Sequence, residues 1–396
     1  MAGGIVMGLA LGVRHVQGLF LLPITSEKGW SREIFGLAMA VQNLTWGIVQ
    51  PFTGMSADRF GSIKVVAIGL VLYALGLYGM ATATTPTGFV LTAGVCIGVA
   101  LSGTAFGVIY AAVGRLVAPE RRAWAMGMAG AIGGLGQFIM VPAAQELLGA
   151  LGWKASLTIL AVTMATLLPL AIPLKESAAG VAHPNIETVP EQRATEVVRE
   201  AFSHSGFWLL NLGFLACGFQ LAFVGNHLPA YLIDKGMSPK DGVGALATIA
   251  LTNVIGIYVC SVLGGRFRQK YLLSGLYLAR TSVIALFLLV PLSRVSVYSF
   301  SAAMGLLWLG AVPLTNGVLS RVFGMRYLST LFGLVFLGHQ LGSFLGVWMG
   351  GYVFDTTRSY DPIWFIAMAL GVLAAVVHWP IDDRQILRAA PGLAPA

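Results

Sequence analysis

Long apolar segments alternate with short polar ones along almost the whole chain. Most apolar segments have about 20 residues, the length of α-helix that crosses the hydrocarbon core of a bilayer. They are rich in Leu, Ala and Gly, and they lack the short alternating segments that are typical of an outer-membrane barrel. The pattern therefore predicts an all-α membrane protein with 12 transmembrane helices. The expected spans are 3–26, 33–57, 63–82, 87–112, 124–149, 153–174, 206–233, 242–265, 270–291, 295–319, 327–354 and 360–380.

One long polar stretch divides these spans into two groups of six. It contains PNIETVPEQRATEVVREAF and follows the sixth span. We therefore expect four parts in the chain. They are an N-terminal six-helix bundle over 1–174, a cytoplasmic linker over 175–205, a C-terminal six-helix bundle over 206–380 and a cytoplasmic tail over 381–396.

The two groups of six resemble each other at a shift of about 206 residues. ALGVRHVQGLFLLP (10–23) aligns with ACGFQLAFVGNHLP (216–229), and EKGWS (27–31) aligns with DKGMS (234–238) once one residue is inserted. Parallel repeats of this kind imply two pseudo-symmetric bundles related by an axis along the membrane normal. A substrate is then expected between the bundles, near the middle of the membrane.

Composition supports the membrane assignment. Hydrophobic residues make up 57% of the chain and charged residues 10%, whereas a soluble protein has about a quarter of its residues charged. Most of the 24 lysine and arginine residues fall in the even-numbered connections and the tail, so the positive-inside rule places both termini in the cytoplasm. The formal charge of +8 is attributed to these loops and not to nucleic-acid binding.

Several functional classes lack their motifs in this sequence. Cys96, Cys217 and Cys260 fall in apolar runs at no metal-ligand spacing, and no nucleotide loop or nucleophile motif is present. We therefore expect no enzyme activity, no cofactor and no metal site. No acidic residue falls at mid-membrane, which disfavours carriers of organic cations because these need a buried negative partner.

Arg14 is the most informative charged residue. It lies about eleven residues into the first span, hence near the middle of the bilayer. A charge there costs roughly 2.5–3.5 kcal/mol, so a compensating partner is expected. One interpretation is a substrate carboxylate bound in bidentate fashion, and the other is a structural arginine that donates to helix carbonyls. In the repeat alignment Arg14 lies opposite Gln220.

GMSADRFGSIK (54–64), in the second connection, resembles the loop motif of major facilitator superfamily transporters. The matching positions are Gly54, Asp58, Arg59, Gly61 and Lys64. The resemblance implies that Asp58 and Arg59, together with a loop arginine such as Arg121, tie the two bundles together at the cytoplasmic side. A solvated turn is the alternative interpretation.

Two further stretches narrow the resemblance. EKGWSRE (27–33) and RRAWAMGMAGAIGGLG (121–136) are similar to segments of bacterial carriers related to monocarboxylate transporters and oxalate–formate exchangers. Those carriers have a substrate arginine in the eighth helix, whereas LATIALTNVIGIYVCSV (246–262) contains none. An anion site in this chain must therefore be built differently.

The resemblance also implies that the first and seventh helices line a central cavity. The expected substrate-binding residues are Arg14, Gln220, His227, His15, Gln17, Tyr110 and Asn316. Histidine titrates near neutral pH, so one histidine could carry a coupled proton where no carboxylate is available. The candidates for this role are His339, His227 and His15, with a packed, hydrogen-bonded histidine as the alternative in each case.

Arg280 is the second arginine inside a span. It falls on the ninth helix, which the resemblance places at the periphery of the bundle. Its expected role is snorkelling or an interhelical bond. The pattern leaves open whether Arg14 or Arg280 is the principal anion-binding arginine.

We therefore expect a monomeric secondary active transporter that moves a small organic anion, of the monocarboxylate class, by alternating access. The resemblance to bacterial carriers implies that it lies in a bacterial inner membrane. Its partners would be that anion, protons and the lipid bilayer, and its mechanism would be proton symport or anion exchange. One alternative is an exporter of drugs or other metabolites, for which Arg14 would be dispensable. The other is a membrane receptor that binds a ligand without transporting it.

Overall fold

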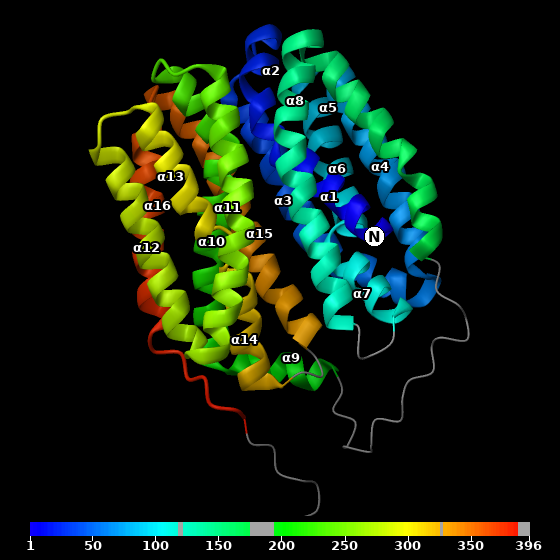
Figure 1. Cartoon of the computed structure of the whole chain (residues 1–396), viewed down its shortest axis with the longest axis vertical. Helices are drawn as coiled ribbons and strands as arrows, with labels where there is room; N and C mark the ends of the chain where they lie inside the picture. The colour runs from blue at the N-terminus through cyan, green and yellow to red at the C-terminus, as the bar shows by residue number, and fades with distance from the viewer. Residues whose placement is uncertain (118–121, 175–193, 325–327, 387–396) are drawn as a thin grey trace, which may run out of the picture.

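The computed structural model describes residues 1–117, 122–174, 194–324 and 328–386. For a few residues in these ranges, including Asp58 and Arg59, it describes the backbone only. Every regular element in the described ranges is helical, so the all-α prediction is confirmed. Figure 1 shows the helices packed in two halves that lie side by side.

The N-terminal half contains the first six spans. Their elements are α1 (Ala2–His15), η1 (Gln17–Phe20), α2 (Leu21–Lys28), α3 (Arg32–Phe60), α4 (Ser62–Thr82), α5 (Pro86–Phe89), the π-helical η2 (Val90–Cys96), α6 (Ile97–Thr104), α7 (Phe106–Leu116), α8 (Arg122–Thr166) and η4 (Leu168–Leu174).

The C-terminal half begins with a short helix that precedes the seventh span. Its elements are α9 (Ala194–Ser203), α10 (Ser205–Asp234), α11 (Pro239–Arg266), α12 (Gln269–Leu289), α13 (Arg294–Leu306), α14 (Ala311–Phe323), α15 (Leu328–Thr357) and α16 (Asp361–His378). Helix α9 falls within the stretch predicted as a linker, and it buries Val197 and Ala201.

The described helices account for the twelve predicted spans. Ten stretches are long and apolar enough to cross a membrane. One of them, Met128–Leu174, has 47 residues and holds two spans, because the chain turns back at Gly152, where φ is 75° (Figure 1). Helix α3 is not among the ten, since polar residues such as Gln42 and Asn43 lower its hydropathy.

Three of the predicted spans are interrupted in the structure. The first span breaks at Val16, the fourth at Ala105, and the tenth between Leu306 and Ala311. A break inside a membrane frees backbone groups that neighbouring elements must satisfy. Those neighbours lie far away in the sequence, which is why the local pattern did not reveal the breaks.

The two halves contact each other through three sets of elements. Helix α3 packs on α15, α8 packs on α11, and η1 and α2 pack on α10. We call the end of the molecule that carries α9 the inner end, and the end that carries the α2–α3 connection the outer end (Figure 1). The break between α1 and η1 lies in the N-terminal half, and the break between α13 and α14 lies in the C-terminal half.

Small residues allow the halves to approach closely toward the outer end. A Cβ added at Gly18 would lie 2.6 Å from the carbonyl oxygen of Gly225, and one added at Gly36 would lie 2.8 Å from the carbonyl oxygen of Val347. Real Cβ atoms do not come so close to backbone oxygens. The observed packing of α3 on α15 therefore requires glycine at position 36.

Candidate functional site

Arg14 lies in the last turn of α1, directly before the break at Val16. Its guanidinium donates a hydrogen bond to Asn43 Oδ1 on α3 and lies 5.2 Å from the ring centroid of Trp46. Asn43 donates its own Nδ2–H to the carbonyl oxygen of Met39 at 2.9 Å. Within the described ranges Arg14 has no carboxylate partner, and its Nε–H has no acceptor. The charge of Arg14 is therefore held by neutral groups alone.

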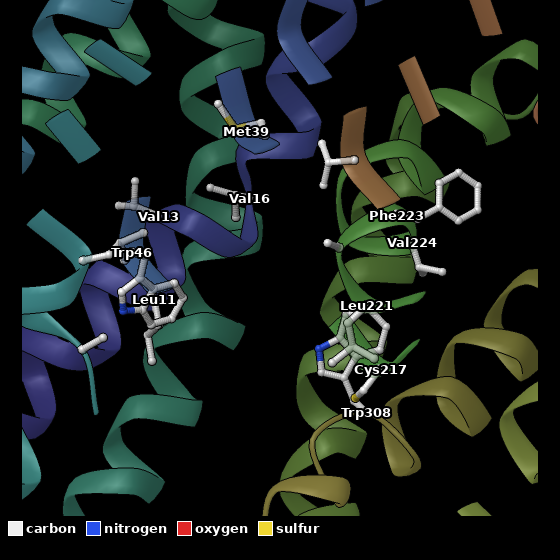
Figure 2. Close-up of a cluster of buried hydrophobic side chains, with 14 of the residues drawn as sticks. Leu11, Val13, Val16, Met39, Trp46, Cys217, Leu221, Phe223, Val224 and Trp308 are labelled. Atoms are coloured by element: carbon white, nitrogen blue, oxygen red, sulfur yellow. The ribbon is translucent and has the colours of Figure 1, made fainter. Parts of the chain in front are cut away.

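The face of α3 that holds Arg14 is turned toward the C-terminal half. Trp46 packs edge-on against Phe336 of α15, with ring centroids 5.3 Å apart. In Figure 2, Leu11 and Trp46 project from the N-terminal half, and Leu221 and Trp308 project from the C-terminal half on the facing side. Arg14 therefore borders the interface between the halves.

His15 and Gln17 lie at the same break in the first span. His15 Nε2 is 3.2 Å from the carbonyl oxygen of Leu246 on α11, a contact that joins the two halves. Gln17 is buried, and its Nε2 has no hydrogen-bond acceptor in the described part of the chain. Three of the predicted site residues, Arg14, His15 and Gln17, therefore lie at the break.

Tyr110 and Asn316 have contacts within their own halves. The ring of Tyr110, on α7, lies 5.9 Å from that of Phe106, and Asn316 Nδ2 donates to the carbonyl oxygen of Val312 at 3.1 Å. Both side chains are partly exposed. Neither is bonded to Arg14 among the contacts that the structure describes.

Gln220 and His227 have their partners inside the C-terminal half. Gln220 accepts a hydrogen bond from Arg280 at 3.1 Å and donates one to the carbonyl oxygen of Ala367 at 2.8 Å. His227 Nε2 lies 2.8 Å from the carbonyl oxygen of Val347. Both side chains have no exposed surface. The repeat alignment set Gln220 opposite Arg14, but Gln220 is bonded to the other intramembrane arginine.

His339 lies on α15 between two aromatic rings. Its ring centroid is 4.7 Å from that of Phe214 and 5.7 Å from that of Phe336. Nδ1 is 3.1 Å from Gln340 Oε1, and Nε2 has no partner among the described residues. Because Phe336 also contacts Trp46, His339 lies one aromatic ring away from the α3 face that holds Arg14.

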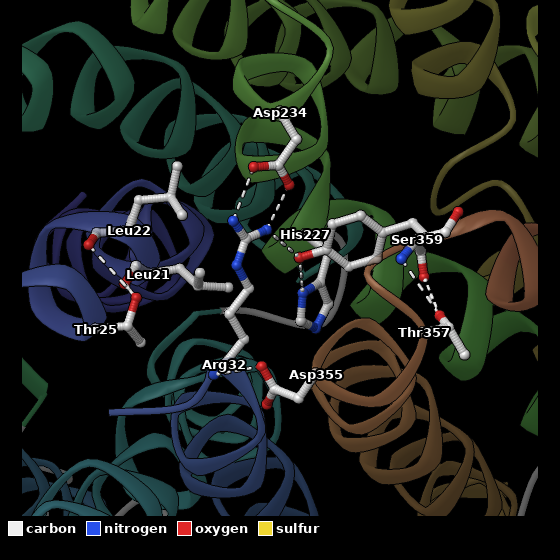
Figure 3. A network of polar contacts seen from close by, with 10 residues as sticks. Leu21, Leu22, Thr25, Arg32, His227, Asp234, Asp355, Thr357 and Ser359 are labelled. Atoms are coloured by element: carbon white, nitrogen blue, oxygen red, sulfur yellow. Dashed lines mark hydrogen bonds and ion pairs between the residues drawn. The ribbon is translucent and has the colours of Figure 1, made fainter. Parts of the chain in front are cut away.

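A polar network joins the halves at the outer end (Figure 3). Arg32, at the start of α3, is paired with Asp234 at the end of α10. The carboxylate of Asp355, near the end of α15, accepts the backbone N–H of Arg32 at 3.2 Å and that of Glu33 at 2.7 Å. The Tyr360 hydroxyl accepts from Arg32 at 3.0 Å. We did not single out these residues from the sequence, although the EKGWSRE segment contains Arg32 and Glu33.

The Tyr360 hydroxyl extends the network toward the interior. It lies 3.2 Å from His227 Nδ1. A tyrosine hydroxyl can both donate and accept a hydrogen bond, so it can bridge Arg32 and His227. The Arg32–Asp234 ion pair and the carboxylate of Asp355 at the start of α3 thus hold the outer end closed. His227 lies beneath them, in contact with Tyr360.

The loop motif of the N-terminal half is described in part. Gly61 separates α3 from α4 and has a φ of 89°, a conformation that residues with a Cβ rarely adopt. A Cβ added at Gly54 would have no neighbour within 4 Å, and Lys64 is exposed. The side chains of Asp58 and Arg59, and all of Arg121, lie outside the described residues.

The corresponding loop of the C-terminal half uses a carboxylate from the tail. In the repeat alignment GRF (265–267) lies over DRF (58–60), so the second loop lacks the aspartate. Asp383, which is 1% exposed, accepts from Arg268 Nε at 3.1 Å and lies 3.9 Å from Arg321 Nε. The hydrogen bonds from Arg268 lower the pKa of this carboxyl.

Two apolar grooves run along α8 and do not include Arg14. One of about 370 Å³ lies toward the outer end and is lined by residues of α2, α8 and α10, including Leu22, Leu148 and Ile233. The other, of about 290 Å³, lies between α8 and α11. Neither groove is lined by a charged side chain.

Comparison with known proteins agrees with this architecture. The chain is 27% identical to the uncharacterized MFS-type transporter YcxA of Bacillus subtilis, over 94% of this chain and 92% of that protein. It is 25% identical to monocarboxylate transporter 13 of Bos taurus, over 94% of this chain and 87% of that protein. Among solved structures, that of a D-xylose-proton symporter superposes with a TM-score of 0.73 at 17% identity, over 97% of this chain and 98% of that one.

The similarity to the symporter structure shows a shared fold of two helical halves. A family model for the Major Facilitator Superfamily matches residues 3–347 of the chain. The match spans the first ten predicted helices and most of the eleventh, and so includes Arg14, the loop motif and the break in the tenth span. The protein is a multi-pass membrane transporter that belongs to the Major Facilitator Superfamily.

Proposed function

We propose that this transporter carries a small organic anion of the monocarboxylate class by alternating access, with proton symport or anion exchange. The observation that carries the proposal is Arg14, a cation within a membrane span and at the interface of the halves, whose partners among the described residues are all neutral. The similarity to a monocarboxylate transporter supports the same class of substrate. We place the protein in a bacterial inner membrane with both termini in the cytoplasm.

The environment of Arg14 suits a carboxylate. Taking an arginine out of water is costly unless its charge is compensated, and Asn43 compensates it only through a carbonyl dipole. The Nε–H donor is buried and has no acceptor among the described residues, so a carboxylate admitted beside it would form a hydrogen bond that the protein does not supply. Hydrogen bonds between guanidinium and carboxylate are roughly twice as strong as those between neutral groups. A bound anion would therefore supply the compensation that the described residues do not.

The contacts at the outer end support the proposal of alternating access. Arg32, Asp234 and Asp355 join α3 to α10 and α15 there. In this conformation we expect Arg14 to be reached from the inner end. Rupture of the Arg32–Asp234 pair, with separation of α3 from α15, would then open the outer route as the halves rock against each other.

For proton coupling we favour His339 over His15 and His227. His339 Nε2 is buried and has no hydrogen-bond partner among the described residues, so a proton bound there would break no existing hydrogen bond. His227 faces the Val347 carbonyl through one nitrogen and the Tyr360 hydroxyl through the other. His15 contacts the carbonyl oxygen of Leu246 in the other half, so this contact depends on the two halves being close together.

The first test measures thermal stabilisation of the purified protein by a panel of carboxylates, sugars, amino acids and lipophilic cations. A ligand that binds the folded state raises the melting temperature by mass action. We expect a small carboxylate to stabilise the wild type and the control variant Lys240→Gln, which removes an exposed positive charge. The same carboxylate should not stabilise Arg14→Gln.

Uptake of that carboxylate into proteoliposomes, with and without a pH gradient, then separates symport from exchange. Equal stabilisation of wild type and Arg14→Gln by lipophilic cations, with no effect of any anion, would show that Arg14 is structural. The exporter function would then replace the one proposed.

A further inference from the structure

The break in the tenth span is stabilised by polar side chains from two other helices. Helix α13 ends at Leu306 and α14 begins at Ala311, so the intervening residues leave backbone groups free inside the membrane. Arg280 of α12 donates to the carbonyl oxygens of Leu307 and Trp308, the second at 3.0 Å. Asn253 Oδ1 of α11 accepts the backbone N–H of Leu309 at 3.0 Å. These bonds fix the backbone on both sides of Trp308.

Arg280 itself has no access to the space between the halves. Its side chain has no exposed surface, and it also donates to Gln220 Oε1 at 3.1 Å and contacts Cys217 Sγ at 3.4 Å. Its charge faces the C-terminal end of α13, where unpaired carbonyls carry partial negative charge. The arginine is therefore compensated by backbone dipoles and acts as an interhelical bond, one of the two roles that the sequence predicts for it.

Trp308, in contrast, is directed toward the N-terminal half. In Figure 2 its indole lies on the side of α10 that faces Leu11 and Trp46, with the ring nitrogen pointing to that side. The indole nitrogen of Trp46 donates to Gln50 at 2.7 Å, whereas that of Trp308 has no acceptor among the described residues. An indole N–H can only donate, so it is suited to an oxygen of an anion.

We propose that Trp308 is the substrate contact of the C-terminal half, opposite Arg14 of the N-terminal half, and that Arg280 and Asn253 are the residues that position it. This inference rests on the proposed function and deepens it. The indole N–H would donate to the carboxylate, and the apolar face of the ring would limit the length of the group attached to it. The substrates would be carboxylates with short side chains.

The arrangement also assigns different roles to the two intramembrane arginines. Arg14 is partly exposed and bonded to one neutral side chain, so it can exchange partners with a ligand. Arg280 is fully buried and bonded to two backbone carbonyls, so loss of its charge would displace Trp308 without removing a ligand contact. Arg280 is therefore a positioning residue.

The test uses the full-length protein and a series of straight-chain monocarboxylates from acetate to octanoate. Affinity for each is measured from its thermal stabilisation of wild type, Trp308→Phe, Trp308→Ala, Asn253→Ala and Arg280→Gln. The matched control is Trp364→Phe, which removes an indole that is fully buried in α16 of the same half. All proteins are compared at one pH and one lipid-to-detergent ratio.

We expect Trp308→Phe to bind the preferred short carboxylate about tenfold more weakly, which corresponds to about 1.4 kcal/mol. Trp308→Ala should shift the preference to longer chains, while Trp364→Phe should keep the wild-type profile. Asn253→Ala and Arg280→Gln should change the chain-length profile in the same direction as Trp308→Ala. If Asn253 and Arg280 had a merely structural role, their substitution would lower the melting temperature of the unliganded protein and leave the rank order of ligands unchanged.

Three outcomes would overturn the inference. In the first, the wild type binds carboxylates and both Trp308 variants keep its profile, which refutes the role of Trp308 while the proposed function stands. In the second, the Trp308 variants change the profile but Asn253→Ala and a folded Arg280→Gln do not, which refutes the positioning role. In the third, no carboxylate stabilises the wild type, and both the proposed function and this inference fail. If Arg280→Gln does not fold, Asn253→Ala decides the second point.

Discussion

Arg32 at the start of α3 and Asp234 at the end of α10 form a two-oxygen ion pair that connects the two halves of the transporter. Nη1 of Arg32 lies 2.5 Å from Oδ2 of Asp234, and Nη2 lies 2.8 Å from Oδ1 (Figure 3). The Arg32 side chain is 13% exposed and that of Asp234 is 28% exposed. The pair is therefore partly shielded from water and closes the outer end in this conformation.

Removal of this ion pair should favour the outward-open state. We expect Asp234→Asn to destabilise the closed outer end by about 1 kcal/mol, since exposed ion pairs contribute up to that amount and bidentate arginine pairs are the stronger ones. The measurement is the rate at which a membrane-impermeant thiol reagent labels Val16→Cys, with Cys96, Cys217 and Cys260 replaced by alanine. Val16 is fully buried here, so labelling reports opening.

The expected rate increase is several-fold, and the charge swap Arg32→Asp with Asp234→Arg should reverse much of it. Unchanged labelling in Asp234→Asn would show that the pair does not hold the outer end closed.

Glycine at position 36 should be necessary for closure of the outer end. A valine there would force the carbonyl of Val347 away from α3, because even a Cβ would lie 2.8 Å from that oxygen. We expect Gly36→Val to increase the labelling of Val16→Cys and to slow transport. Gly275→Ala is the control, since a Cβ at that helical position has no neighbour within 4 Å and should increase helix stability slightly. Equal labelling of the two variants would contradict the prediction.

Asp383 should make a pH-dependent contribution to stability. The hydrogen bonds from Arg268 lower the pKa of this carboxyl in the folded protein. Its stabilising effect is therefore complete above the ordinary aspartate pKa of about 4 and is lost as the pH falls through the lower, folded-state value. We expect Asp383→Asn to lose roughly 1.5–3 kcal/mol at pH 7, the range for hydrogen bonds to charged groups.

The measurement for Asp383 is thermal unfolding of the purified protein between pH 7 and pH 3. The difference in melting temperature between wild type and Asp383→Asn should narrow toward pH 3. Asp382→Asn is the matched control, because the neighbouring side chain is 55% exposed and pairs only with the exposed Arg384 among the described residues. A difference that stays constant over the whole pH range would argue against a charged role for Asp383.

His339 should be required for proton-driven accumulation but not for exchange. An uncharged His339→Asn variant keeps a polar side chain beside Gln340 but cannot bind a proton at neutral pH. We expect it to lose at least tenfold in uptake driven by a pH gradient while it retains exchange of labelled for unlabelled carboxylate. His204→Asn, at the inner end beside Phe323, is the control. Full gradient-driven uptake by His339→Asn would transfer the proposed role to His15 or His227.

Much of the architecture could be predicted from the chain alone. A span must cross the hydrocarbon core as a helix, so each one needs about 20 apolar residues. Because this requirement is local, the twelve spans can be predicted from the sequence. Helix α3 was predicted in spite of Gln42, Asn43 and Gln50, because its length and its flanking polar turns compensate for the lower hydropathy. Arg14 stood out for the same reason, as a charge in a segment that has to be apolar.

The partners of the polar residues depended on tertiary structure. A period of 3.6 residues does not reveal the rotation of a helix relative to its neighbours, so Gln220 aligned with Arg14 in the repeat and yet bonds to Arg280. The ion pair of Arg32 with Asp234 joins residues far apart in the chain, and each residue alone looks like an ordinary charge at a membrane surface.

The breaks in the first, fourth and tenth spans show most clearly which features depend on the sequence alone and which depend on the tertiary structure. Hydropathy determined that these segments cross the membrane, because apolar composition is a property of the segment itself. Only the tertiary structure decided that the tenth span opens at Trp308, because the groups that satisfy its free backbone, Arg280 and Asn253, come from two other helices. Inside a membrane a helix can be interrupted only where such partners exist, and their presence depends on how the helices pack.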